Sequence, residues 1–421
     1  MRKTIKLFSL MATLALAMVS KMVWADAAAA PAATPSPAPT PAVSVNGFVD
    51  GYYTYNFTNS SAGKVGAGNL GYNFNSADDT FNLGLGEVDV NAVLGSTSGH
   101  LSLITGDSAG LIMGTGTYGV GVLQAYVSYA PGQWTFNLGR FVTWMGNEVI
   151  QSKSNMNYSR SLLFVYTIPY FNQGLSVGWA TSDSKVAVTG YMTQGWNNSG
   201  VLFSAGPMGD GADLGKTYGL EAKYAPDANF SVVLNGIMGP NGGAGTFFNP
   251  DTTKSVGEAI ITVVPGGGAW SFALDAEAGS TSLGAVTVTA NDGTTKISSL
   301  PFWGAALYGR YQISSDWAAA LRLEQVVDTD GYGLGLYGLI PQTPTTGKGS
   351  NDVTADEVTL TIEHNLSSNL LFRLEGRMDM ASSGGTQYAP ITPSSTITVP
   401  GTFAGGSGTQ TTGTASAVMS F

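Results

Sequence analysis

The chain has 421 residues, a net charge of −10 and no cysteine, and only 11% of its residues are charged. Soluble domains typically carry about 25% charged residues, so this composition is unusual for one. The lack of cysteine excludes disulfides and thiolate metal sites. An acidic chain is a poor partner for nucleic acid, because phosphate contacts need Lys and Arg. Beyond the N-terminus, no apolar run reaches the roughly 20 residues that a transmembrane helix needs.

The N-terminal region has the pattern of an export signal. A basic start at residues 2–6 precedes an apolar stretch at residues 7–19, and a small residue follows at Ala25. This order predicts a signal peptide over residues 1–25, cleaved after Ala25 on Sec-dependent export. Residues 26–43 are rich in Ala and Pro, which favours an extended periplasmic linker.

From residue 44 to 421, strand patterns are separated alternately by long polar loops and short turns. The predicted strands are Ser44–Phe57, Phe81–Leu94, His100–Thr105, Gly121–Ala130, Gln133–Phe141, Leu175–Thr181, Lys185–Thr193, Lys216–Ala225, Asn229–Met238, Ser255–Val264, Ala269–Gly279, Phe302–Gln312, Trp317–Val327, Thr354–Glu363, Leu370–Met380 and Thr411–Phe421. An even number of strands, with short periplasmic turns and long outer loops, is typical of bacterial outer-membrane barrels. The sequence therefore predicts an all-β fold, a transmembrane antiparallel β-barrel of about 16 strands. A secreted β-sandwich or solenoid is the alternative, but it does not explain the alternation.

Within the strands, apolar and charged residues alternate with period two, which sends them to opposite faces of the sheet. In Leu370–Met380, for example, Leu374 and Met378 alternate with Arg373 and Arg377. We expect the apolar face to meet lipid, with a girdle of Trp134, Trp179, Trp270, Trp303 and Trp317 near the strand ends. The residues expected to form the lumen wall are Glu221, Lys223, Asp275, Glu277, Arg310, Arg322, Glu324, Glu357, Glu363, Arg373, Glu375, Arg377 and Asp379.

The stretch from Gly139 to Trp179 is too long for a turn and shows no clean period in its middle. Long loops in compact domains are usually functional. Residues 142–172 are rich in Asn, Gln and Ser, which can satisfy backbone groups inside a barrel, so we expect this loop to fold inward and narrow a pore. An external loop over the mouth is the alternative. The residues expected at the pore constriction are Arg140, Glu148, Lys153 and Arg160.

Motifs for catalysis or cofactor binding are incomplete in this sequence. The G-x-G-x-x-G pattern at residues 114–119 follows no βα unit, so it does not predict dinucleotide binding. The stretch at residues 328–331 lacks the spaced ligands of a calcium loop. Neither His100 nor His364 lies near a recognisable Ser nucleophile motif. We therefore expect no enzyme activity, no cofactor and no metal site.

Two blocks of residues resemble a known family. The first block is Val45–Tyr53. The second comprises Gly139-Arg140-Phe141, Gly146-Asn147-Glu148, Asn157-Tyr158-Ser159-Arg160-Ser161, Pro169 and Gly174. With these blocks the chain resembles the putative β-barrel porin-2 (OmpL-like) family of Gram-negative bacteria, which implies an outer-membrane pore. The final strand, ending on Phe421, resembles the assembly signal that the outer-membrane insertion machinery reads.

These observations predict a porin for passive diffusion of small hydrophilic solutes. Acids outnumber bases on the expected wall, so we expect a weak preference for cations. One alternative is a channel selective for a solute class such as sugars or peptides, and another is a structural or adhesin barrel with a blocked lumen. The expected partners are outer-membrane lipids and lipopolysaccharide, the assembly machinery, small solutes and, by family analogy, two further copies in a homotrimer.

Overall fold

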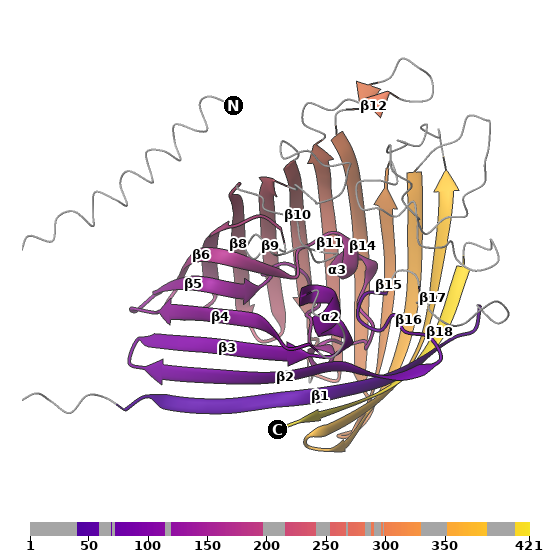
Figure 1. The fold of residues 1–421 in the computed structure, drawn as a ribbon, viewed down its shortest axis with the longest axis horizontal. Coiled ribbons are helices and arrows are strands. Elements are labelled where there is room, and N and C mark those ends of the chain that lie inside the picture. Colours follow the sequence, from indigo (N-terminus) through magenta and orange to yellow (C-terminus); the bar gives the residue numbers. More distant parts are fainter. Residues whose placement is uncertain are drawn as a thin grey trace, which may run out of the picture. The chain divides into compact units, whose positions relative to one another are not determined.

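Antiparallel strands close on themselves into a barrel of 16 strands in the computed structural model of this chain (Figure 1). The structure describes residues 40–58, 69, 72–113, 119–196, 215–240, 253–266, 268–282, 288–289, 296–297, 299–329, 352–384 and 409–421. The barrel lies within a compact unit that begins at Pro41 and ends at Phe421. The predicted signal peptide lies outside the described residues.

Neighbouring strands along the chain are also neighbours in the barrel, and β1 pairs with β18 to close it. The strands are β1 (Ala42–Asn56), β2 (Thr80–Leu94), β3 (Thr97–Thr105), β4 (Gly121–Tyr129), β5 (Trp134–Val142), β6 (Phe171–Ala180), β7 (Val186–Thr193), β8 (Thr217–Asp227), β9 (Phe230–Pro240), β10 (Thr253–Val263), β11 (Trp270–Ser282), β14 (Ser299–Gln312), β15 (Trp317–Asp328), β16 (Asp352–Ser367), β17 (Leu370–Gly384) and β18 (Thr409–Ser420). A small separate sheet pairs β12 (Val288–Thr289) with β13 (Lys296–Ile297). The predicted barrel and its strand number are confirmed.

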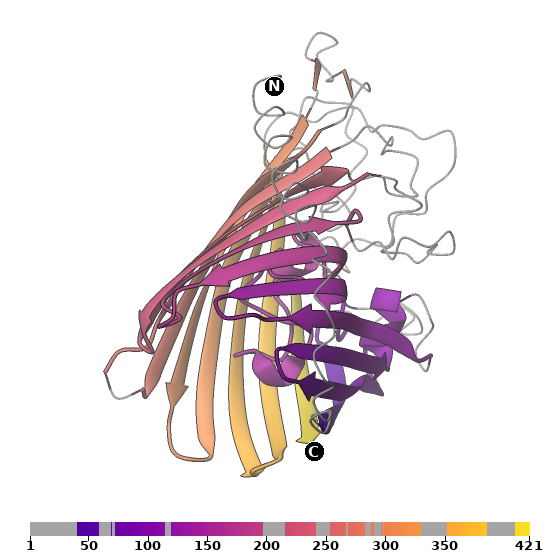
Figure 2. The same cartoon turned by 90° about the vertical axis from the view of Figure 1, so that its left-hand side faces the viewer.

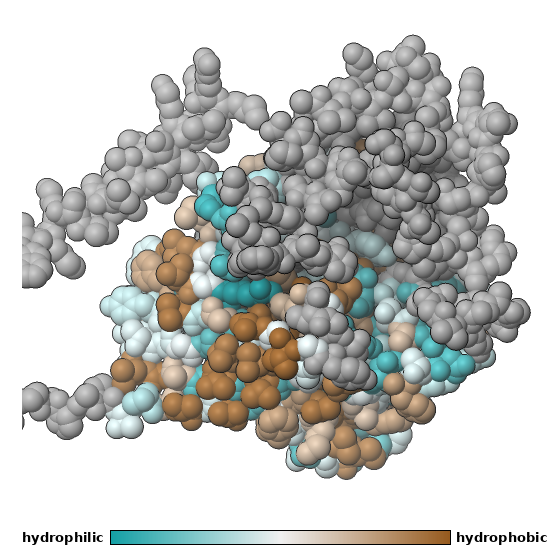
Figure 3. All heavy atoms as spheres, in the orientation of Figure 1, coloured by the Kyte–Doolittle hydropathy of each residue, from teal (hydrophilic) through white to brown (hydrophobic). Residues whose placement is uncertain are grey.

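The period-two pattern explains the two faces of the wall. On β17, Leu374 is 53% exposed, whereas Arg373 and Arg377 are each 2% exposed. The outward face of β17 is thus apolar, as expected of a strand that meets lipid, and its inward face carries the polar residues. Figure 3 shows hydrophobic residues, in brown, gathered over the surface where Figure 1 places β1 to β4.

Exposed tryptophans lie near strand ends. Trp134, Trp270 and Trp317 each begin a strand beside a short turn, and Trp303 lies near the opposite end of the wall. Their side chains are 44–48% exposed. Trp179 is paired with Trp134 across β5 and β6 and is half-buried. Figure 2 shows the short turns gathered at one rim of the barrel.

Short helices lie in the connections between strands. They are α2 (Asp107–Met113), the 3-10 helix η1 (Ser152–Ser154) and α3 (Leu162–Tyr166), and Figure 1 shows α2 and α3 against the strands of the barrel. Leu163 and Phe164 of α3 belong to a buried apolar cluster that also contains wall residues such as Phe302 and Val326. Within the described residues, no helix has both the length and the apolar character to cross a membrane.

Candidate functional site

The segment that joins β5 to β6, residues 143–170, folds into the barrel and is bound to its inner wall. Glu375 of β17 accepts hydrogen bonds from the backbone amides of Tyr158 and Ser159, at 2.6 and 3.0 Å. Glu324 of β15 accepts two more, both of 2.7 Å, from the first two residues of α3. Irregular backbone inside a barrel needs such partners, because unpaired buried amides are costly. The predicted inward loop is therefore present; we call residues 143–170 the inward loop.

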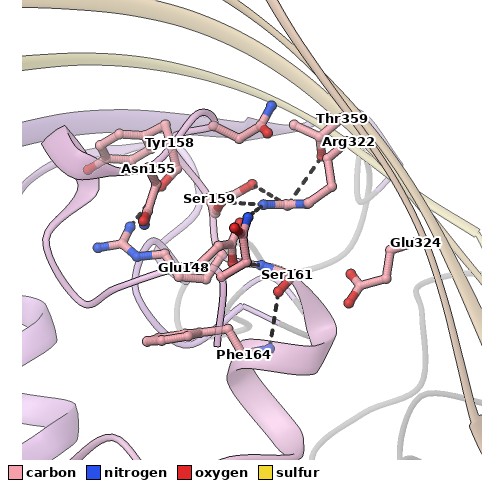
Figure 4. A network of polar contacts seen from close by, with 12 residues as sticks. Glu148, Asn155, Tyr158, Ser159, Ser161, Phe164, Arg322, Glu324 and Thr359 are labelled. Atoms are coloured by element: carbon pink, nitrogen blue, oxygen red, sulfur yellow. Dashed lines mark hydrogen bonds and ion pairs between the residues drawn. The ribbon is translucent and has the colours of Figure 1, made fainter. Parts of the chain in front are cut away.

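Arg322 of β15 forms the centre of a buried ion-pair network between the wall and the inward loop (Figure 4). Its side chain is fully buried, and its guanidinium lies 2.6 Å from Glu148 of the inward loop and 2.6 Å from Glu357 of β16. It also donates to the carbonyl of Ser159 at 2.7 Å. Charge-assisted hydrogen bonds of this kind are shorter and stronger than neutral ones. Arg322 thus holds the inward loop against the wall.

Two further arginines of β17 bind backbone carbonyls of the inward loop. Arg373 donates to the carbonyls of Ser152 and Asn155, at 2.6 and 2.8 Å. Arg377 donates to the carbonyl of Arg160 at 2.7 Å. A guanidinium has five donors in a fixed fork, so one arginine can satisfy several carbonyls that face the wall. Together, these contacts position both η1 and the start of α3.

The inward loop also stabilises itself. Ser161 caps α3: its hydroxyl accepts from the amide of Phe164 at 3.1 Å, and its own amide donates to Glu148 at 2.6 Å. Arg160 is 3% exposed and donates to the carbonyl of Tyr158 at 2.7 Å, while its guanidinium lies over the ring of Phe74. Burial lowers the pKa of Arg160 from its ordinary value. These residues form the interior of the loop rather than its solvent-facing surface.

The four residues expected at the constriction have different environments. Glu148 and Arg160 are each 3% exposed and act as anchors, so they do not face an open passage. Arg140 is half-buried and lies over the ring of Phe171. Lys153 is exposed beside β1. Of these four, Lys153 is the residue best placed to meet solute.

Most of the charged wall residues lie beneath the inward loop. Ten of the thirteen expected wall residues are buried and so do not line open space, and most of these ten bind the loop or one another. The buried ones are Asp275, Glu277, Arg322, Glu324, Glu357, Glu363, Arg373, Glu375, Arg377 and Asp379. Lys223 is exposed, and Glu221 and Arg310 are half-buried. Arg310 forms an ion pair of 2.6 Å with Glu363.

Open space lies beside the start of the inward loop, against β4 to β7. A cavity of about 410 Å³ is present there, and its lining is polar, aromatic and free of formal charge. Its polar lining includes Gln124, Gln133, Thr135, Asn137, Thr143, Ser176 and Thr189, and its aromatic lining includes Tyr126, Phe141, Trp144 and Tyr191. Trp144 and Tyr191 stack with their ring centroids 3.8 Å apart.

Three acids that anchor the inward loop were not among the predicted site residues. Asp50 accepts from the hydroxyl of Ser152 at 2.6 Å, Glu87 accepts from the side chain of Gln151, and Glu258 accepts from the amide of Gly146 at 2.8 Å. The alternation of apolar and polar residues, which identified the other wall residues, is weak in their strands. On β10 the inward neighbours of Glu258 are Val256 and Ile260, so apolar residues occur on both faces of that strand and the alternation is obscured.

Phe421 lies at the end of the wall, directly after β18. Its amide and its carbonyl both pair with the backbone of Gly47 on β1, at 3.0 Å, and its ring is 62% exposed. An added Cβ at Gly47 would lie 2.8 Å from the Phe421 ring, so a glycine is needed for this close approach. The terminal aromatic therefore lies beside the seam where the barrel closes.

Solved structures of outer-membrane proteins share this fold at low sequence identity. The anion-selective porin from Comamonas acidovorans is 10% identical, aligns over 91% of this chain and 100% of its own, and has a TM-score of 0.53. The outer membrane channel DcaP of Acinetobacter baumannii is 12% identical over 91% and 100% of the two chains, with a TM-score of 0.51. OmpT of Vibrio cholerae, in its trimer form, is 11% identical over 90% and 99%, with a TM-score of 0.54.

The family assignment rests on the sequence. Among curated proteins, none matches the chain closely enough to count as a relative. A family model described as "Putative beta-barrel porin-2, OmpL-like" matches residues 42–421, which include every strand of the barrel. The chain therefore belongs to this family of outer-membrane porins.

Proposed function

We propose that the chain forms a passive diffusion channel for small hydrophilic solutes across the outer membrane, with no catalytic activity. The observation that carries this proposal is the cavity of about 410 Å³ between the inward loop and β4 to β7. Its amide and hydroxyl groups can exchange hydrogen bonds with water and with passing solutes, and its lack of formal charge avoids tight binding of ions. Membership of a porin family supports the same function.

A weak preference for cations is part of this proposal. Acids outnumber bases among the buried residues of the described chain, so the wall around the passage carries a net negative charge whose field attracts cations. The preference is expected to be weak because Arg322, Arg373 and Arg377 offset part of that charge. The similarity to an anion-selective porin, at 10% identity, concerns the fold alone.

Reversal potentials in a salt gradient test the sign of this preference. Glu221 and Lys223 lie two residues apart on β8 with their side chains on the same face, so they form a matched pair. We expect E221Q to weaken the cation preference and K223Q to strengthen it, and both effects should fade at molar salt, where the screening length is about 3 Å. A clear anion preference of the wild-type channel would contradict this part of the proposal.

Liposome swelling tests passive diffusion itself. Vesicles that contain the barrel should admit neutral sugars at rates that fall smoothly with solute size, because an unselective pore sorts by size alone. Vesicles without protein provide the baseline. If swelling with small sugars equals that baseline, the diffusion proposal is wrong. One sugar that enters faster than smaller ones would instead favour a selective channel.

A channel selective for sugars is the second candidate function. The stacked rings of Trp144 and Tyr191 lie in the same cavity as the amides of Gln124 and Asn137. Ring faces beside amides and hydroxyls suit a neutral polyhydroxylated solute, because binding sites combine apolar surface with a few placed polar groups. If this candidate is correct, one sugar should block the ion current at low concentration, and Y191A should relieve the block. Tyr129, on the exposed side of β4, provides the control Y129A.

We further propose a homotrimer in which the outer face of β3 to β5 meets another copy. These strands have nine residues each, fewer than the 11 to 16 residues of β8 to β11 and β14 to β18. A hollow on this outer face is lined by small and apolar residues, among them Gly99, Ala125 and Leu138. Small residues let two surfaces approach closely within a membrane. Cross-linking should show trimers that L138N weakens and L360N, on the opposite wall, leaves intact; a monomeric wild type would contradict the proposal.

Export and assembly complete the proposed function. We infer that residues 1–25 direct Sec export and that the barrel then meets outer-membrane lipids, lipopolysaccharide and the assembly machinery. The exposed ring of Phe421, beside the closing seam, is accessible to that machinery. F421A should lower the fraction of chain that reaches the heat-modifiable, folded form in cells, whereas M419A, at the neighbouring outward position of β18, should not. Equal folded fractions for both variants would show that Phe421 has no role in assembly.

A further inference from the structure

Three acids on the inner wall lie unusually close together beneath the start of the inward loop. Glu258 of β10 is directly opposite Glu277 of β11 in the strand register, and Asp275 lies two residues from Glu277 on the same face of β11. One carboxylate oxygen from each residue lies within 4.8 Å of the other two. We call Glu258, Asp275 and Glu277 the wall triad.

The wall triad is buried and, in the described part of the chain, has no positively charged partner. Its members are 5%, 2% and 4% exposed. Among the described residues, no Lys or Arg forms an ion pair with any of the three, although other wall acids such as Glu357 and Glu363 are paired with arginine. Carboxylates in a buried site are costly unless they are paired, protonated or bound to a metal. The triad therefore differs in kind from the other charged groups of the wall.

Several oxygens at the wall triad have no hydrogen-bond partner among the residues that the structure describes. Asp275 has one such oxygen and Glu277 has two. The nearby hydroxyl of Thr167 does not satisfy Glu277, because it donates its proton to the carbonyl of Leu163 at 2.6 Å. Buried oxygens in native proteins rarely lack a partner, so three at one place call for an explanation.

Asn235 on β9 provides an independent observation. It is 7% exposed, stands opposite Glu258 in the strand register, and its amide nitrogen lies 2.5 Å from the Glu258 carboxylate. Its side-chain oxygen, in the same amide plane, also has no partner. An amide can present either its oxygen or its nitrogen to a neighbour by rotating through 180°. Rotated in this way, Asn235 would add a neutral oxygen from a third strand to the carboxylate oxygens of the triad.

We propose that the wall triad, with Asn235, binds a calcium ion that fixes the inward loop to the wall. Calcium takes 6–8 oxygen ligands at about 2.3–2.6 Å, so two of its ligands can be separated by at most about 5 Å. Oxygens from all three members of the triad lie within that span of one another. Magnesium keeps several waters and is usually bound through one or two carboxylates, so a buried site of three carboxylates and an amide suits calcium better. Water would complete the calcium coordination.

Two backbone amides connect this site to the inward loop. The amide of Gly146 donates to Glu258 at 2.8 Å, and that of Asn147 donates to Asp275 at 3.0 Å. In the structure the amide nitrogen of Asn235 also donates to the carbonyl of Trp144, a bond that the rotated amide would give up. Of the two acids that hold the loop, Asp275 has a second oxygen with no partner among the described residues, whereas both oxygens of Glu258 accept hydrogen bonds. A bound calcium ion would orient the carboxylates and, through them, the first residues of the inward loop.

Terbium luminescence tests the proposal directly, because terbium replaces calcium and is sensitised by a nearby tryptophan. The barrel would be refolded in detergent without lipopolysaccharide, stripped with EDTA and titrated with terbium under tryptophan excitation. We expect one saturable site from which calcium displaces terbium at least tenfold more effectively than magnesium. E277Q and D275N should lose the signal, and W144F should lower it. E221Q, a half-buried acid on the next strand beyond Asn235, should keep it.

Thermal unfolding provides a second measurement that does not depend on tryptophan. Calcium should raise the unfolding temperature of the wild-type barrel over that in EDTA, because a ligand that binds the folded state stabilises it. The shift should disappear in E277Q, whose folding is checked by heat-modifiable migration. If calcium gives no shift and E277Q is as stable as the wild type or more stable, the triad is protonated and holds no metal. The barrel can conduct whether or not it binds calcium. A negative result in either measurement would therefore contradict the calcium site and leave the proposed diffusion channel unaffected.

Discussion

At the scale of single residues, the inward loop depends on buried charges that are matched across the lumen. Arg322 illustrates this arrangement, since it is paired with Glu357 on its own wall and with Glu148 on the loop. A buried ion pair is not by itself evidence of high stability, because desolvation offsets much of the attraction. Removing one partner of such a pair is destabilising, however, because the other charge is then buried without compensation.

Replacing Arg322 with Met should destabilise the barrel by about 3–5 kcal/mol, because Glu148 and Glu357 would then be buried without a positively charged partner. The urea midpoint of unfolding in detergent micelles measures this cost. The control is K185M, since Lys185 and Asp183 are more than half exposed and 3.7 Å apart in a short turn. An exposed pair of that kind contributes about 0–1 kcal/mol. Equal midpoints for R322M and K185M would show that the network does not anchor the loop.

Gly146 is the second residue on which the path of the loop depends. Its φ of +94° is in the left-handed region, and an added Cβ would lie 2.8 Å from the side chain of Ile168. G146A should therefore lower the free energy of unfolding by at least about 1–2 kcal/mol, the ordinary cost of a left-handed conformation for a residue with a Cβ. Gly190 on β7 has no atom within 4 Å of its Cβ position, so G190A is the matched control. If both variants unfold at the same urea concentration, the left-handed turn is not required.

At the scale of elements, the strands could be predicted because alternation with period two is a local property of the sequence. Their ends were less accurate: β3 begins at Thr97 rather than His100, and β16 continues to Ser367. His364 follows the predicted strand Thr354–Glu363 and in the structure lies within β16. Polar residues near the rim continue the strand pairing after the apolar pattern has ended, so the pattern alone places the end too early.

The helices inside the lumen could not be predicted in the same way. Helix α3 has five residues, too few for a helical period to appear, and the wall holds its first turn through Glu324. The sequence likewise could not show whether Glu148 and Arg160 line the constriction. Their types and position suggested a pore, but only the three-dimensional path of the loop shows that both are covered.

The outward faces of the strands support a prediction about lipid. Leu374 is 53% exposed on β17, so L374R would place a charge in the apolar band and should cost about 2–4 kcal/mol if the site is near mid-membrane. The control is L366R, because Leu366 is equally apolar and 58% exposed but lies beside the short turn after β16. Folding into lipid vesicles, followed by the urea midpoint, measures both. An unchanged midpoint for L374R would mean that this face does not meet lipid.

At the scale of the whole barrel, the lumen has two unlike sides. The strands from β10 to β17 carry buried charges that bind the inward loop, whereas β4 to β7 face a cavity whose lining has no formal charge. This division explains how one loop can be held firmly and still leave space for solute. The charged side works as an attachment surface, and the uncharged side is the candidate passage.

Single-channel conductance in a planar bilayer tests this account most directly. The wild-type barrel should give steady, discrete current steps, and deletion of residues 146–157 should give larger steps, because that segment lies across the lumen between β1 and β11. Heat-modifiable migration would confirm that the shortened barrel is folded. If the wild type gives no steps at any voltage, or if the folded deletion variant conducts as the wild type does, the inward loop does not narrow an open channel.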